Sequence, residues 1–133
     1  ALHPYLRVRN VMDVAVHGLG GATFADALTQ QTGTHEGALN IRSETDRLFA
    51  PVAPECVLHD AGLGRALAMT FSGTRHLMVW NPWIEKSRAM KDFGDDEYTR
   101  MLCLEPANAG EDAVTLAPGE SHTLSLALQA TLT

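Results

Sequence analysis

Apolar and polar residues alternate along much of this chain with the period of two that is typical of β-strands. At the C-terminus, one face of a predicted half-buried strand carries Leu124, Leu126, Leu128, Ala130 and Leu132. Further strands are predicted at Leu6–Arg9, Val11–His17, Cys56–His59, Arg65–Phe71, His76–Trp80 and Met101–Glu105. Only Ile84–Phe93 has helical character, and the polar stretch Gln30–Gly37 is predicted to be a loop. The pattern predicts one all-β unit over residues 1–133, a sandwich of large antiparallel sheets.

Composition excludes several classes of protein. The net charge is −6, so a basic surface for nucleic acid is not expected, and no apolar run is long enough to cross a membrane. Cys56 and Cys103 both lie in apolar runs, which predicts buried free thiols in a reducing compartment such as the cytoplasm. The chain begins at Ala1 without an initiator Met, so we expect it to be processed or part of a longer polypeptide.

A single acid, Glu105, ends the apolar run Met101–Leu104. Strand alternation puts its carboxylate on the same face as Met101 and Cys103. Beside such groups the carboxylate should be partly desolvated, and its pKa raised toward the range of a general base. The alternative is an ordinary surface acid at the end of a strand.

Polar and aromatic side chains near the N-terminus could bind a polar ligand such as a sugar. Alternation places His3, Tyr5 and Arg7 on one strand face. That combination fits a sugar, although an exposed strand face near a chain end would look the same.

The segment Trp80–Lys86 places two tryptophans and Pro82 around Asn81. Rings such as that of Trp83 can stack on sugars, and the Asn81 amide can bind hydroxyls. The competing interpretation makes the tryptophans core residues and Asn81-Pro82 a turn. Asp46 begins another short strand, where an Asp is usually a turn former.

Metal and cofactor chemistry has no recognisable motif here. There is no CxxC pair, no HExxH and no glycine-rich phosphate loop, and signatures of Ser or Cys nucleophiles are missing. The remaining histidines are scattered without ligand spacing, so we expect no metal site and no cofactor. These are His17, His35, His59, His76 and His122.

Taken together, the segments resemble the C-terminal half of hexose-6-phosphate mutarotases (glucose-6-phosphate 1-epimerases), in the aldose 1-epimerase or galactose mutarotase-like superfamily. The specific pieces are Trp-Asn-Pro-Trp at 80–83 and Cys-x-Glu-x-x-Asn at 103–108. The other matching pieces, in family order, are His3–Val8, Val16–Leu19, Thr45–Leu48, Gly94–Tyr98 and Leu116–Glu120. The resemblance therefore covers nearly the whole chain.

The resemblance implies a β-supersandwich with a sugar groove across one large sheet and an interconversion of α and β anomers that needs no cofactor. It implies that Glu105 is the base and His3 the acid, and that Asp46 holds the sugar or orients the histidine. Tyr5, Asn81 and Trp83 are the further candidates for substrate binding.

The resemblance also implies a missing partner region. The N-terminal half of the same protein would lie upstream of Ala1 and supply the arginines that hold the 6-phosphate, so we expect the chain alone to be inactive or to need that half. The substrate would be a sugar phosphate, with no nucleic acid or membrane partner. The alternatives are an aldose 1-epimerase for a free sugar and a non-catalytic carbohydrate-binding β-domain.

Overall fold

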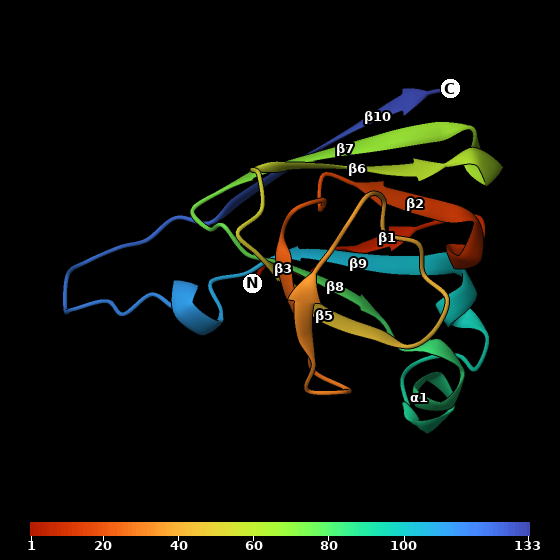
Figure 1. Ribbon diagram of the computed structural model, residues 1–133, viewed down its shortest axis with the longest axis horizontal. Coiled ribbons are helices and arrows are strands. Elements are labelled where there is room, and N and C mark those ends of the chain that lie inside the picture. The colour runs from red at the N-terminus through yellow and green to blue at the C-terminus, as the bar shows by residue number, and fades with distance from the viewer.

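A computed structural model describes all residues, 1–133, and shows two antiparallel β-sheets packed as a sandwich (Figure 1). The six-stranded sheet has the order β1-β9-β8-β5-β3-β4. Its strands are β1 (Tyr5–Arg7), β9 (Met101–Pro106), β8 (Leu77–Asn81), β5 (Thr45–Ala50), β3 (Thr23–Asp26) and β4 (Thr32–Thr34). The four-stranded sheet has the order β10-β7-β6-β2. Its strands are β10 (Ser125–Leu132), β7 (Arg65–Ser72), β6 (Glu55–Asp60) and β2 (Val14–His17).

Helices are few and short. The only α-helix, α1 (Trp83–Ala89), follows β8 directly and lies beside one end of the six-stranded sheet (Figure 1). No helix of the protein is long and apolar enough to cross a membrane. The 3₁₀ helices are η1 (Val11–Asp13), η2 (Ala61–Leu63), η3 (Glu97–Arg100) and η4 (Gly110–Asp112). The predicted all-β class is confirmed.

The hydrophobic core lies between the two sheets. Alternate residues of each strand point inward, such as Leu102 and Leu104 of β9 and Leu58 and Met69 of the opposite sheet, and all four are almost completely buried. Burying a side chain of this size contributes roughly 1.5–3 kcal/mol. Because side chains alternate along a strand, and Leu102 and Leu104 of β9 point inward, Cys103 and Glu105 point to the outer face of the six-stranded sheet.

Strands β8 and β9 lie inside the six-stranded sheet, each with a hydrogen-bonded strand on both sides. All six residues of β9 are buried, including those on its outer face, and Val79 of β8 is fully buried. The strand predicted at His76–Trp80 is confirmed as β8, and it lies inside the sheet. The Glu105 carboxylate is therefore shielded from water although it points to the outer face of the sheet.

The sequence missed two short strands and misplaced a helix. Residues of β3 carried no prediction, and β4 lies inside the predicted loop Gln30–Gly37. Both are only three or four residues long, too short for alternation to be visible. Val11–Asp13 forms a 3₁₀ turn rather than the start of a strand, because Asn10 caps it by accepting a hydrogen bond from the Met12 N–H. Helix α1 begins one residue before the predicted Ile84 and ends before Phe93.

The prediction that the C-terminal strand is half-buried is wrong. Leu128 is 46% exposed and Leu132 is 87% exposed. The strand is the edge of its sheet and pairs only with β7; Leu126 packs against the core, but the later residues of its apolar face are exposed. Alternation correctly predicted the strand, but it cannot say whether the second layer lies in the same chain.

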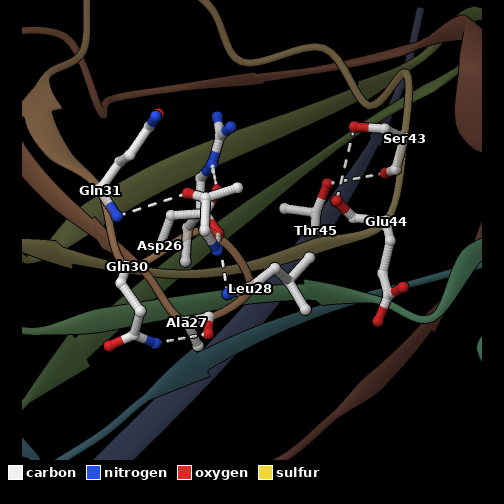
Figure 2. Close-up of polar contacts among 10 residues, drawn as sticks. Asp26, Ala27, Leu28, Gln30, Gln31, Ser43, Glu44 and Thr45 are labelled. Carbon is white, nitrogen blue, oxygen red and sulfur yellow. Dashed lines mark hydrogen bonds and ion pairs between the residues drawn. The ribbon is translucent and has the colours of Figure 1, made fainter.

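Asp26 ties the end of β3 to the turn that follows and to β5. Its carboxylate accepts hydrogen bonds from the N–H groups of Leu28 at 2.9 Å and Thr29 at 3.1 Å, and from Arg47 Nε at 2.7 Å (Figure 2 shows the Asp26–Leu28 bond). Burial alone would raise the pKa of Asp26. The hydrogen bonds from Arg47, Thr29 and Leu28 outweigh burial and hold the pKa below its usual range. This anchor fixes the strand that carries Asp46 on its opposite face.

Replacing Asp26 with Asn should destabilise the protein at neutral pH, by roughly 1–3 kcal/mol, because a charged acceptor of three hydrogen bonds is lost. A lowered folded-state pKa means that the ionised carboxylate stabilises the fold above its unfolded pKa of about 3.9, and that this contribution is lost as pH falls through the folded value. The difference from wild type should therefore shrink in acid. Urea unfolding at neutral and acidic pH measures it, with the exposed Glu36→Gln as control. A difference that stays constant in acid would contradict the electrostatic explanation.

Candidate active site

The pairing of β1 with β9 places the N-terminal residues over the centre of the six-stranded sheet. Tyr5 pairs with Cys103, and the pairing continues beyond the strand through a 3.0 Å hydrogen bond from Leu2 N–H to the Pro106 carbonyl. In the same register His3 stands opposite Glu105. Because directly opposite residues point to the same side of a sheet, their side chains meet on the outer face.

His3 and Glu105 are in direct contact. The His3 Nε2 atom lies 3.2 Å from Glu105 Oε1. The imidazole is 46% exposed, whereas the carboxylate is only 8% exposed. The accessible group is therefore the histidine, and the sheltered group is the acid behind it, which is an arrangement that can hold and move a proton.

Aromatic rings surround the imidazole. Tyr5 stacks on His3 with ring centroids 5.0 Å apart and planes 14° apart. Trp80 of β8 presents an edge contact to both rings, at 6.1 Å from His3 and 6.0 Å from Tyr5. The three rings hold the imidazole next to Glu105 and leave aromatic surface beside it.

Burial is the main influence on the pKa of the Glu105 carboxylate. It raises the pKa of Glu105, the nearby Asp46 raises it further, and the His3 side chain acts in the opposite direction. Burial, with the charges of Cys103 and Glu105, also raises the pKa of Tyr5, so its hydroxyl remains a hydrogen-bond donor at neutral pH. The expectation of a partly desolvated Glu105 with a raised pKa is confirmed.

Asp46 comes to the same face from β5. It pairs with Trp80, which in turn pairs with Cys103, so these three residues point to the outer side in successive strands. Its partly buried carboxylate is close enough to act on the titration of Glu105. Tyr5 and Asp46 thus lie on the same face of the sheet as the His3–Glu105 pair.

The structure does not support a substrate contact for Asn81. Its side chain is completely buried: Nδ2 donates to the carbonyls of Tyr98 and Met101, each at 2.9 Å, and Oδ1 accepts from the Trp83 N–H at 3.0 Å. Asn81 stands one residue after Trp80 and therefore points to the opposite face. Its amide joins β8, α1 and the start of β9, and that structural role replaces the predicted one.

Trp83 is also placed away from the acid–base pair. It packs against the hydrophobic core and against Tyr98, with ring centroids 5.2 Å apart. Trp80 is the tryptophan of the site, and the sequence did not single it out. Strand parity places Trp80 on the same face as Met78, but only the observed pairing of Met78 with Glu105 brings that face to the acid–base pair.

The protein has two hollows of appreciable size, of which the second adjoins the site through Tyr5. One, of about 560 Å³, includes Ala25, Leu48 and His76 in its lining, and the other, of about 380 Å³, includes Tyr5 and Arg100. Neither has His3 or Glu105 in its lining.

Solved structures share the fold of this chain. A crystal structure from Salmonella typhimurium, named a "putative mutarotase (YeaD)", matches with a TM-score of 0.83 and 25% identity over 99% of this chain and 45% of that one. The structure named HI1317 matches equally well, over 98% of this chain and 45% of that one. The chain belongs to the aldose 1-epimerase family, whose pattern matches residues 1–129.

Curated relatives carry a more specific name. The protein from Cenchrus ciliaris, "Putative glucose-6-phosphate 1-epimerase", is 37% identical over 132 residues, which cover 98% of this chain and 40% of the relative. A protein of the same name from Haemophilus influenzae is 28% identical over 97% of this chain and 45% of its own length. The chain thus spans less than half the length of the relatives it matches.

Replacing Asn81 with Ala should lower the free energy of unfolding by roughly 1–3 kcal/mol, because two buried carbonyls and one N–H would lose their partner. The exposed Asn40→Ala is the matched control. Chemical unfolding measures the effect. An unchanged unfolding curve together with a raised KM for sugar would restore a substrate-binding role.

Proposed function

We propose that the complete protein containing this chain is a mutarotase that interconverts the α and β anomers of a hexose 6-phosphate such as glucose 6-phosphate. The observation that carries the proposal is the 3.2 Å contact between His3 and the sheltered Glu105, in a chain of the aldose 1-epimerase family. The names of the relatives support the phosphorylated substrate.

The reaction needs one base and one acid. Glu105 takes the proton of the anomeric hydroxyl O1 while His3 gives a proton to the ring oxygen O5, the bond between C1 and O5 breaks, and the open aldehyde forms. After rotation about the C1–C2 bond, O5 attacks the other face of C1 and both protons return. O1 and O5 are bonded to the same carbon, so an acid and a base that are neighbours can serve both. The raised pKa of Glu105 suits the role of base.

Other residues of the outer face bind the sugar in this proposal. Asp46 has a carboxylate that can accept bonds from sugar hydroxyls or orient His3, and the Tyr5 hydroxyl is a donor. Trp80 and Tyr5 offer aromatic surface on which a sugar ring can pack.

The residues 1–133 form the C-terminal half of the mutarotase sandwich in this proposal, and the N-terminal half of the same protein completes the groove and binds the phosphate. The 40–45% coverage of the relatives supports that division. The exposed Leu128 and Leu132 of β10 are consistent with further strands packing over them. Both cysteines are free thiols, which supports a cytoplasmic protein.

Replacing Glu105 with Gln in the complete protein should lower the rate of anomer exchange by roughly 10²- to 10⁴-fold, because the amide cannot accept the O1 proton. Saturation-transfer NMR between the α and β anomers of glucose 6-phosphate measures the rate. The exposed Glu55→Gln on β6, in the other sheet, is the control and should exchange at the wild-type rate.

A Glu105→Gln protein with the wild-type rate would show that Glu105 is not the base. Equal rates for glucose and glucose 6-phosphate in the wild type would remove the phosphate from the proposal and leave an aldose 1-epimerase. Binding of the sugar without any acceleration of exchange would indicate a carbohydrate-binding domain.

A further inference from the structure

A third potential metal ligand lies beside the His3–Glu105 pair. His3, Cys103 and Glu105 each offer one ligand atom, and these three atoms all lie within 4.8 Å of one another. The residues come from two paired strand segments: Cys103 and Glu105 are alternate residues of β9, and His3 stands opposite Glu105. The strand register that places His3 opposite Glu105 therefore also places the Cys103 thiol near both side chains.

The Cys103 thiol makes no hydrogen bond in the structure. Its residue is completely buried and takes part in none of the side-chain hydrogen bonds, including the longer ones allowed to sulfur. Burial raises the pKa of this thiol, so without a metal it stays protonated. A sulfur of this kind, turned toward an imidazole and a carboxylate, is what a borderline metal ion finds attractive.

We propose that His3, Cys103 and Glu105 form a site for Zn²⁺ or a similar thiophilic divalent ion. Zinc is bound by His nitrogen and carboxylate oxygen at about 2.0–2.2 Å and by Cys sulfur at about 2.3 Å, usually with four ligands. Tetrahedral ligands at those lengths lie about 3.3–3.8 Å apart. The His3–Glu105 separation of 3.2 Å is just below that range, and all three ligand atoms lie within 4.8 Å of one another, so side-chain shifts of about 1 Å would bring them to coordinating distances.

Binding of Zn²⁺ to the three side chains releases protons. Zn²⁺ displaces the thiol proton of Cys103, and it binds His3 and Glu105 through deprotonated ligand atoms; the displaced protons go to water. The three protein ligands are then a neutral imidazole, a thiolate and a carboxylate, with total charge −2, which matches the ion. A water molecule takes the fourth position, since His3 leaves the site open to solvent on that side.

The ion blocks the acid–base pair, a consequence that rests on the proposed function. Metal coordination uses the Nε2 atom that would donate the proton and the carboxylate that would accept one. Zinc is therefore a reversible inhibitor of anomer exchange, competing for the same atoms as the substrate.

A Co²⁺ titration tests binding without any assay of activity. Cobalt bound by a thiolate in a tetrahedral site has a charge-transfer absorption that aqueous Co²⁺ lacks. We expect a saturable band in the wild type and in Cys56→Ser, and none in Cys103→Ser; added Zn²⁺ should abolish the band. Cys56 is the matched control, because it is also a buried free thiol but lies in the other sheet.

Two results would overturn the site: a band of equal strength in Cys103→Ser, or no saturable band in folded wild-type protein. If circular dichroism shows that Cys103→Ser is unfolded, His3→Ala decides instead. His3 is half-exposed, so its removal leaves the core intact. Loss of this ligand should weaken cobalt binding by at least the roughly 10- to 100-fold that losing an outer-shell partner costs. Unchanged binding would exclude His3 and the site.

The inhibitory role is measured separately, by the rate of anomer exchange at increasing Zn²⁺, each variant normalised to its own metal-free rate. The inhibition constant for Zn²⁺, corrected for competing substrate, should equal the Zn²⁺ dissociation constant calculated from the cobalt displacement, in the wild type and in Cys56→Ser. Binding without inhibition would refute the blocking of the acid–base pair. A wild type with no mutarotase activity would refute the proposed function and leave the cobalt result standing.

Discussion

The antiparallel register between β1 and β9 is the constraint on which the site depends. It makes Leu2 bond to Pro106 and Tyr5 pair with Cys103, so that His3 meets Glu105 across about a hundred residues of sequence. A slip by one residue would turn every side chain of β1 to the opposite face. Burial of Leu6 between the sheets prevents that slip, because the core accepts Leu6 only in this register. The same strand register thus fixes both the packing of the core and the geometry of the acid–base pair.

The position of Glu105 in a central strand has a cost in stability. A carboxylate that is 8% exposed loses much of its hydration, and the fold compensates it with the one imidazole at 3.2 Å. Asp46 adds a second negative charge nearby, which increases the cost. A strand selected only for stability would carry an apolar residue there. The arrangement makes sense when the desolvated carboxylate is needed for proton transfer.

Strand parity predicted as much of the site as any local pattern can. It placed Glu105 with Cys103, and His3 with Tyr5, correctly, but it could not show that the two strands are neighbours; the family resemblance supplied that link. The errors at Asn81 and Trp83 came from treating a cluster of sugar-like residues as one surface, although adjacent strand residues point to opposite faces. The exposure of Leu128 was beyond prediction, because burial depends on what packs against a strand.

The two tryptophans differ in what they touch, and this gives the protein a built-in optical signal. Trp80 contacts the rings of His3 and Tyr5, whereas Trp83 packs on Tyr98 and the core. Indole emission responds to the polarity and charge of its surroundings, so light from Trp80 depends on the state of the imidazole and on what displaces water beside it. With Trp83 replaced by Phe, the fluorescence of the protein would come from one ring at the wall of the site, and occupancy could be followed without a label.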